Sequence, residues 1–419
     1  MSVARGTAGG VSRGGDDGRM PRSLALIVIS AGCILALSMG VRQSLGLYLT
    51  PVSEAIGTGR EAYALSLGLM NLMWGLFAPF AGVLADKRGP MAVGLAGGAV
   101  YAVGVVWLAF SGSELELAGA GILIGIGLSG AGFTVILGAV GRAAPERFRA
   151  SALALASLGS SLGQFVALPY AHGLTDAAGW WWSLVILGIT SALMVPLALG
   201  LMGASKAGDP IVSRQTLGEA VREAFSTPGF WLLNAGFFVC GFHLAFISVH
   251  LPAYAADRGL EPWVATAALT AVGLGNIFGT YGFAKLGTVI QKKDALALLY
   301  TIRAFIFLGF LLLPLSPTLV ITMSFLLGLT WLGTVPLTSG LVAHMFGPVY
   351  LSTLFGLVFM GHQVGGFLGS WLAGRIFDMV GSYDPVWWLS VGLGLISALL
   401  HILIRERPVE RLRAAAATA

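Results

Sequence analysis

Apolar stretches follow one another along almost the whole chain, with short polar connections between them. Each stretch is about as long as the roughly 20 residues that a helix needs to cross the hydrocarbon core of a bilayer. Lipid offers the backbone no hydrogen-bond partners, so helices are the expected spanning elements of this all-α membrane protein. The pattern predicts twelve transmembrane helices, at residues 23–50, 61–85, 90–111, 115–140, 150–173, 180–203, 229–252, 263–284, 295–314, 317–342, 350–374 and 385–404.

The two halves of the chain repeat each other. Corresponding positions hold the pairs Pro51 and Pro252, Arg42 and His243, Asn71 and Asn276, and Asp176 and Asp378, and Gly159-x3-Gly163 recurs as Gly361-x3-Gly365. We therefore expect two six-helix bundles related by pseudo-two-fold symmetry. Duplicated membrane proteins of this kind place a substrate cavity between the halves, near the membrane centre. The repeat partners Arg42 and His243 could therefore face one another across the pathway.

The connections predict how the chain is divided. The N-terminal bundle is expected at 23–203 and the C-terminal bundle at 229–404, with a tail at 1–22, a linker at 204–228 and a tail at 405–419. The first tail is rich in Gly, Ser, Arg and Asp and lacks the apolar core of a signal peptide, which indicates disorder. Within the linker, residues 216–225 could form a surface helix.

Composition and charge support a membrane protein and set its orientation. The chain is 56% hydrophobic and 10% charged, with a mean hydropathy of +0.85, too apolar for a soluble domain of this length. Lys and Arg gather in the two tails and the even-numbered connections; the exceptions are Arg42, Arg60, Arg258, Arg303 and Arg375. The positive-inside rule then predicts that both termini are cytoplasmic. The expected location is a bacterial inner or plasma membrane. The net charge of +5 does not indicate nucleic-acid binding.

The connection after the second span carries a recognisable motif, Gly82-Val-Leu-Ala-Asp86-Lys87-Arg88-Gly89. It resembles the signature of the major facilitator superfamily, and a degraded copy begins at Gly287 in the second half. The resemblance implies the major facilitator fold and a conformational latch formed by Gly82, Asp86, Lys87 and Gly89. In that latch Gly82 lets helices approach closely, and Asp86 pairs with a cation or caps a neighbouring helix.

Within that superfamily the chain is similar to the monocarboxylate and oxalate–formate transporter branch. The similarity rests on Val41–Tyr48 in the first span, Ser157–Gly163 in the fifth and Gly374–Tyr383 at the end of the eleventh. It implies secondary transport of a small carboxylate. The acidic, aromatic-rich opening of the family's first span is absent, and so is the Asp-x3-Arg pair of span 8, so proton coupling through that pair is not carried over.

Two cations lie inside the predicted spans. Arg42 lies in the first span and Arg303 in the ninth, whereas no Asp or Glu lies in the middle of any span. Charges in the hydrocarbon zone are expensive and usually functional, and an anionic substrate could supply the missing counter-charge. Alternatively, Arg42 could snorkel to Glu54 or Glu61, and Arg303 could brace the second bundle through backbone carbonyls.

Other polar residues within the spans complete a candidate cavity. The predicted substrate-binding residues are Arg42, Gln43, Tyr48, Asn71, Gln164, His243, Asn276, Arg303, His362 and Gln363, with Trp74, Asn234 and Trp331 as further candidates. His243 and His362 are the proton-coupling candidates, because histidine titrates near neutral pH. The alternative for each histidine is a hydrogen-bonded structural role.

No catalytic, phosphate-binding or metal-binding motif is recognisable, and Cys33 and Cys240 both lie within spans. We therefore expect a transporter without a cofactor, functional as a monomer, driven by a gradient and not by nucleotide hydrolysis. The favoured function is transport of a small organic anion, a monocarboxylate above all, by proton symport or exchange. The alternatives are a carrier of a neutral or aromatic nutrient such as a vitamin, and a drug-efflux carrier. Drug-efflux carriers usually hold cations with acidic groups in the cavity, and this chain has no Asp or Glu in the middle of its spans.

Overall fold

The computed structural model describes residues 21–204, 215–347 and 349–417, and its regular elements are helices. The first half contains α1 (Arg22–Ser44), η1 (Leu45–Tyr48), α2 (Leu49–Ile56), α3 (Arg60–Arg88), α4 (Pro90–Phe110), α5 (Glu114–Ala131), α6 (Phe133–Ala143), α7 (Glu146–Ser191), α8 (Met194–Ala198) and η2 (Leu199–Leu201). The second half contains α9 (Leu217–Ser226), α10 (Pro228–Asp257), α11 (Pro262–Val289), α12 (Lys292–Leu312), α13 (Pro317–Leu329), α14 (Thr334–Phe346), α15 (Leu351–Val380), α16 (Asp384–Leu403) and α17 (Glu410–Ala417).

The described helices cross the membrane twelve times. By length and composition they form 11 candidate spans, of which Glu146–Leu201, at 56 residues, is too long for a single crossing. It turns back at Gly179, whose φ of +82° is a conformation that favours glycine. The Tyr170 hydroxyl lies 3.1 Å from Thr190 Oγ1, which shows that the two arms run side by side. The predicted twelve-helix fold is therefore confirmed.

Three of the predicted helices are broken inside the membrane, where the sequence suggests continuous spans. The first crossing passes through the short 3-10 turn η1, the fourth breaks at Gly132 between α5 and α6, and the tenth breaks between α13 and α14. At the last break, carbonyl groups of Thr330 and Trp331 accept hydrogen bonds from a buried side chain, described below. An internal donor of this kind lets a helix break at membrane depth.

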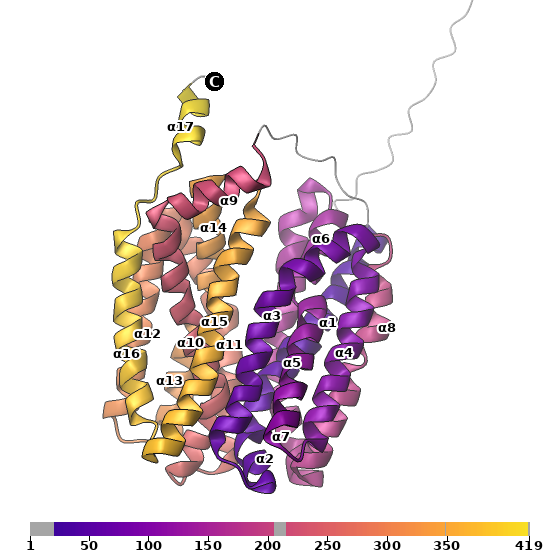
Figure 1. Cartoon of the computed structure of the whole chain (residues 1–419), viewed down its shortest axis with the longest axis vertical. Helices are drawn as coiled ribbons and strands as arrows, with labels where there is room; N and C mark the ends of the chain where they lie inside the picture. The colour runs from indigo at the N-terminus through magenta and orange to yellow at the C-terminus, as the bar shows by residue number, and fades with distance from the viewer. Residues whose placement is uncertain (1–20, 205–214, 348, 418–419) are drawn as a thin grey trace, which may run out of the picture.

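The helices form two bundles, α1–α8 and α10–α16, which lie side by side in Figure 1. The repeated glycine motifs make equivalent contacts within each bundle. A Cβ atom on Gly163 would collide with the Ala36 backbone of α1, and a Cβ on Gly365 would collide with the Phe238 backbone of α10. In both bundles the motif therefore lets two helices pack backbone to backbone.

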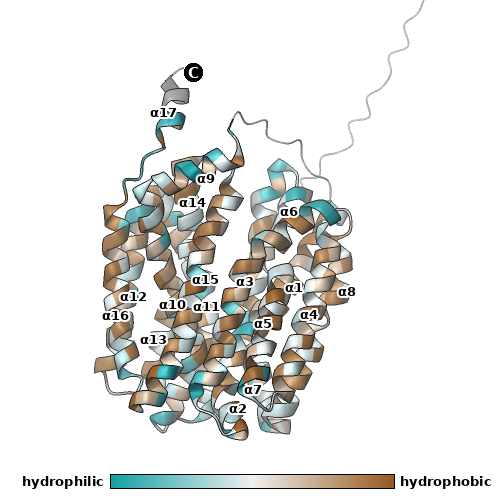
Figure 2. Cartoon of the chain, in the orientation of Figure 1, coloured by the Kyte–Doolittle hydropathy of each residue, from teal (hydrophilic) through white to brown (hydrophobic). Residues whose placement is uncertain are grey.

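The two ends of the bundles differ in character. We call the end that carries α9 and α17, at the top of Figure 1, the tail side, and the other end the opposite side. In Figure 2 hydrophobic residues cover most of the spanning helices, whereas hydrophilic residues gather on α6 and α9 at the tail side. The predicted linker helix is present as α9, which Thr216 and Glu219 begin with a capping box. The predicted disorder of the first tail concerns residues that lie, apart from 21 and 22, outside the described part.

Candidate functional site

The two bundles are fastened together at the opposite side. The guanidinium of Arg60, at the start of α3, donates to both carboxylate oxygens of Asp257 at the end of α10, at 2.6 and 2.7 Å. It also donates to the Tyr383 hydroxyl at 3.1 Å and lies 3.8 Å from the ring centroid of Phe377. Tyr383 lies between α15 and α16, and burial raises the pKa of its hydroxyl, which stays protonated.

A second acid from the C-terminal bundle holds the same helix start. Asp378 accepts hydrogen bonds from the backbone N–H groups of Arg60 and Glu61, at 3.0 and 2.8 Å. Glu61 in turn accepts from the indole of Trp371 at 2.8 Å and from Arg375 at 3.3 Å. These contacts and those of Arg60 form what we call the Arg60 network. The sequence marked Asp378 only as a repeat position, with no role assigned.

At the membrane centre a row of polar groups crosses between the bundles. Arg42 donates to the side-chain oxygen of Asn71 at 3.4 Å, and Gln363 of α15 donates to the backbone oxygen of Asn71 at 3.3 Å. The side-chain oxygen of Gln363 lies 2.8 Å from Nδ1 of His362. The structure thus brings four predicted site residues together, and we call Arg42, Asn71, Gln363 and His362 the central polar row.

Aromatic rings lie beside this row. The Arg42 guanidinium is 5.6 Å from the ring centroid of Trp74, and Trp74 meets Phe359 edge to face at 5.2 Å. Phe359 stacks on His362, with ring centroids 5.6 Å apart and an angle of 9° between the planes. Phe359 is a site residue that the sequence reasoning missed, because an aromatic residue in an apolar span looks like ordinary packing.

Arg42 has no carboxylate partner among the described residues. Its Nε is buried and makes no hydrogen bond, and the amide nitrogen of the neighbouring Gln43 is also buried without an acceptor. The side-chain oxygen of Gln43 accepts from Ser248 of the other bundle at 3.1 Å. Snorkelling to Glu61 is not seen, because that carboxylate is occupied by Trp371 and Arg375. The site therefore offers hydrogen-bond donors without a matching acid.

The bundles diverge toward the tail side (Figure 1). On the tail-side arm of α3, Leu76, Phe80 and Val83 are exposed by 41%, 66% and 54%. On the facing arm of α15, a Cβ on Gly356 would meet nothing within 4 Å. The hydrogen bonds between the bundles described above lie at the membrane centre and at the opposite side. None of them joins the bundles at the tail side.

Two predicted ligands are used inside the C-terminal bundle. His243 Nε2 lies 2.9 Å from the Ser390 carbonyl oxygen, and its ring packs on Phe307 at 4.5 Å. The expectation that His243 faces Arg42 across the pathway is wrong, because the ring points toward α12 and α16. Arg303 is fully buried and donates to the carbonyl oxygens of Thr330 and Trp331. It therefore takes the bracing position considered as the alternative to substrate binding.

The remaining predicted ligands make other contacts. The Tyr48 hydroxyl lies 2.6 Å from Ser183 Oγ within the N-terminal bundle. Asn276 connects the bundles, donating to Ser161 Oγ at 3.0 Å, and also accepts from the backbone N–H of Leu332 at the α13–α14 break. The side-chain oxygen of Gln164 is buried and accepts no hydrogen bond. These contacts do not join the central polar row, so a binding role for the three stays a prediction.

The predicted latch lies at the tail-side end of α3. Asp86 pairs with Arg142 of α6 at 2.7 Å, and this pair is partly exposed. Gly89, with φ of +88°, lets the chain turn from α3 into α4, while Lys87 is exposed. The structure has room for a side chain at position 82, since a Cβ on Gly82 would lie at an ordinary contact distance of 3.5 Å from Thr134. The expected close helix approach at Gly82 is thus not seen in this conformation.

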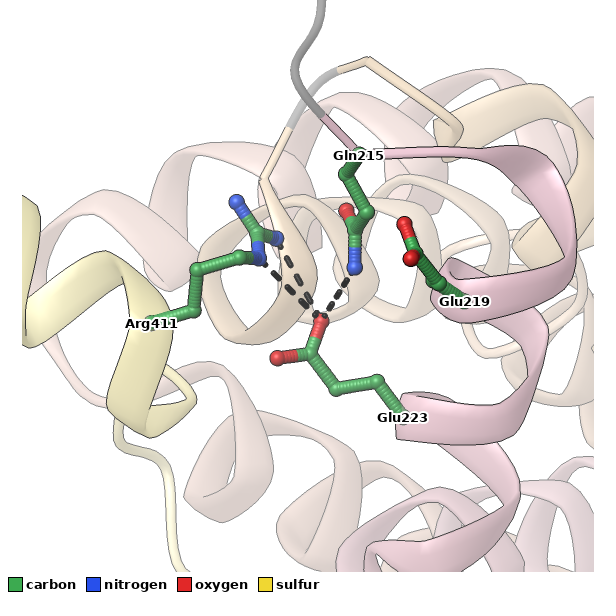
Figure 3. Close-up of a pocket in the computed structure, with 4 residues that line it drawn as sticks. All are labelled: Gln215, Glu219, Glu223 and Arg411. Atoms are coloured by element: carbon green, nitrogen blue, oxygen red, sulfur yellow. Dashed lines mark hydrogen bonds and ion pairs between the residues drawn. The ribbon is translucent and has the colours of Figure 1, made fainter.

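A separate pocket at the tail side lies outside the spans. Figure 3 shows its lining residues, Gln215, Glu219, Glu223 and Arg411, around a cavity of about 340 Å³. Glu223 of α9 accepts from Arg411 of α17 at 3.4 Å and from Gln215 at 2.9 Å. The backbone N–H of Val409 donates to Met345 O at 2.9 Å. These contacts fasten the linker helix and the final helix to the C-terminal bundle.

Curated relatives match the chain at low identity over most of its length. Monocarboxylate transporter 13 from Bos taurus is 26% identical over 406 residues, which cover 92% of this chain and 91% of that protein. Monocarboxylate transporter 11 from Homo sapiens is 27% identical over 90% of this chain and 82% of its own length. The uncharacterized MFS-type transporter YcxA from Bacillus subtilis is 24% identical, covering 90% of this chain and 95% of YcxA.

A solved structure shares the fold. It is a bacterial homolog of the human lysosomal transporter Spinster in an inward-facing, unoccupied conformation, with a TM-score of 0.68 and 15% identity. The match covers 92% of this chain and 95% of that one. A family model, the Major Facilitator Superfamily, matches residues 31–369, which run from α1 into α15 and include the central polar row. The chain is therefore a transporter and not an enzyme, and it belongs to the Major Facilitator Superfamily.

Proposed function

We propose that this transporter carries a small organic anion, a monocarboxylate, by alternating access. The observation that carries the proposal is Arg42, a half-buried guanidinium at the membrane centre with an unpartnered Nε and no described acid beside it. A charge in this position is expensive unless it is paired. A substrate carboxylate can supply the pairing with two parallel hydrogen bonds. The relatives named as monocarboxylate transporters support the same substrate class.

The tail side is assigned to the cytoplasm because Lys and Arg gather there, which makes both termini cytoplasmic. The structure then corresponds to a state open to the cytoplasm of the bacterial cell and closed on the outside by the Arg60 network. Opening to the outside requires the Arg60 contacts with Asp257 and Asp378 to break. The bundles then rock about the central site, a motion expected of one monomer.

Of the two proton-coupling candidates, His362 has the suitable position. It belongs to the central polar row, where it contacts Gln363, and it is half-buried. His243 is fully buried and directed away from the row. If the carrier is a proton symporter, a proton held by His362 would lie next to the substrate. An exchanger would use the same anion site without this proton.

A neutral or aromatic nutrient is the second candidate, and the rings of Trp74 and Phe359 favour it. Drug efflux is less well supported, since cationic drugs would be repelled by Arg42. Counterflow in proteoliposomes separates these candidates, because it needs no driving gradient. Vesicles loaded with unlabelled solute are given the labelled form of pyruvate, nicotinamide or a cationic dye outside. The proposal predicts accumulation of pyruvate, and its loss in Arg42→Gln. Accumulation of the neutral or cationic probe alone would contradict it.

A further inference from the structure

We propose that the substrate anion carries an aromatic ring, and that the ring lies against Trp74 and Phe359 while Arg42 holds the carboxylate. The inference rests on the proposed anion transport and narrows the class to aromatic monocarboxylates. We call Trp74, Phe355, Phe359 and His362 the ring subsite. It is built from both bundles, since Trp74 belongs to α3 and the other three residues to α15.

The ring subsite begins directly at the cation. Trp74 lies under the Arg42 guanidinium, Phe359 meets Trp74 edge to face at 5.2 Å, and His362 stacks on Phe359. Phe355 lies one turn further along α15, 6.4 Å from Phe359. A molecule bound with its carboxylate on Arg42 would therefore have aromatic faces and edges beside the rest of its body. Aromatic pairs prefer offset-stacked and edge-to-face arrangements over a face-to-face sandwich, and they gain free energy beyond the burial of their area.

Exposure distinguishes the ring subsite from the packed aromatic core of the C-terminal bundle. Phe246, Phe307 and Trp387 are exposed by 1% or less. Phe355, Phe359 and His362 are only half-buried. Phe359 meets Trp74 of the N-terminal bundle, whereas Phe355 and His362 also contact Phe237 of α10, with ring centroids 6.2 and 4.7 Å apart. The spacing of Phe355, Phe359 and His362, four and three residues, places them in one stripe of the helix. The stripe continues from the central polar row toward the tail side, where the two bundles diverge (Figure 1).

The charge arrangement selects among ring-bearing compounds. A neutral aromatic compound would leave the Arg42 charge without a counter-ion, and an aromatic cation would be repelled. A short aliphatic acid such as acetate would satisfy Arg42 but leave the half-buried rings in contact with water. A dicarboxylate would bring its second charge against apolar faces, which costs free energy without a second cation. An acid with one carboxylate and one ring matches both features.

Matched pairs of probes test this inference on the purified full-length protein. Phenylpyruvate and pyruvate share the same charged end and differ in the phenyl group, and phenylacetamide is a neutral analogue of phenylacetate. We expect phenylpyruvate to bind at least about tenfold more tightly than pyruvate, a modest gain for one buried ring. Phe359→Leu and Trp74→Leu should remove most of this preference, measured in each variant as the ratio of the Kd values for pyruvate and phenylpyruvate. Phe305→Leu on α12, a residue 64% exposed, is the control and should change neither Kd.

The outcomes separate this inference from the function on which it rests. Equal affinity for pyruvate and phenylpyruvate would overturn the ring subsite and leave anion transport in place. Phenylacetamide binding as tightly as phenylacetate would overturn the anion site itself. Should Trp74→Leu fail to fold, as judged by its size-exclusion profile, Phe359→Leu alone gives the test. Unchanged preference for phenylpyruvate in that variant would contradict the proposal.

Discussion

The carboxylate of Asp378, at the end of α15, caps the start of α3 in the other bundle by accepting from the backbone N–H of Arg60 at 3.0 Å. The same carboxylate accepts from the next N–H, that of Glu61, at 2.8 Å. The first turn of a helix has free N–H groups and the positive end of the helix dipole, so an acid is stabilising there. Because this cap joins two bundles, it stabilises one state of the transport cycle and not the other.

Asp378→Ala should shift the population toward the state open to the opposite side. Loss of an N-cap typically costs about 0.5–2 kcal/mol, enough to change the ratio of two states severalfold. Leu115 and Glu261 are exposed positions at the opposite side, one in each bundle. Spin labels at these positions should show a larger population with a longer distance between the two labels.

Asp176→Ala is the matched control for this experiment. Asp176 is the repeat partner of Asp378, but among the residues that the structure describes it pairs with His172 of its own helix, at 3.4 Å. Its replacement should leave the label distances unchanged. Equal shifts in both variants, or no shift in Asp378→Ala, would show that the cap does not hold the bundles together.

Asp86→Asn should slow transport while leaving the equilibrium Kd for substrate nearly intact. Asp86 lies at the tail-side end of α3 and pairs with Arg142, away from the central polar row. The pair is partly exposed, so its loss should cost no more than about 1 kcal/mol of stability. Turnover in proteoliposomes and binding to purified protein are the two measurements. A large rise in Kd with normal turnover would place Asp86 in the binding site instead.

Arg303→Met should destabilise the protein without abolishing substrate binding. The variant leaves the buried carbonyl groups of Thr330 and Trp331 without a donor, and hydrogen bonds to charged groups contribute about 1.5–3 kcal/mol. Thermal unfolding in detergent should show a lower Tm. The control is Arg258→Met, which removes an exposed pair with Asp384 and should leave Tm unchanged. Normal Tm with lost binding would return Arg303 to the substrate site.

His362→Gln should uncouple proton entry from substrate entry, whereas His243→Gln should not. Of these two histidines, His362 belongs to the central polar row, with Nδ1 at 2.8 Å from the side-chain oxygen of Gln363. A pH-sensitive dye inside proteoliposomes follows the proton, and the parent protein must first show substrate-driven acidification. If the parent shows none, the carrier is an exchanger. Acidification that survives His362→Gln would exclude this histidine as the coupling group.

The fold could be predicted from the sequence because twelve apolar stretches and an internal repeat leave few alternatives. The breaks at Gly132 and between α13 and α14 could not, since they depend on tertiary contacts such as those of Arg303. Polar residues in nearly uniform apolar helices do not reveal the direction in which they point. For this reason the sequence could not show that Arg42 and His362 reach the membrane centre, or that Tyr48 and His243 are directed elsewhere.

The repeat itself misled the site prediction at one position. Arg42 and His243 occupy corresponding places in the two halves, which suggested that they face one another. In the structure Arg42 donates to α3, but His243 contacts α16 and α12 of its own bundle. A duplicated backbone therefore does not preserve the direction of its side chains. Phe359 was missed for a related reason, since only its contact with Trp74 reveals its place beside the site.

The most direct test of the account is the equilibrium Kd of a carboxylate for purified Arg42 variants that elute as folded, monodisperse protein. Removing one partner of a desolvated charge pair typically costs about 2–5 kcal/mol, so Arg42→Gln should raise Kd by at least about 30-fold. Arg42→Lys keeps the charge but loses the paired hydrogen bonds, and its Kd should fall between those of the parent and Arg42→Gln. A folded Arg42→Gln protein that binds the carboxylate as tightly as the parent would contradict the central claim.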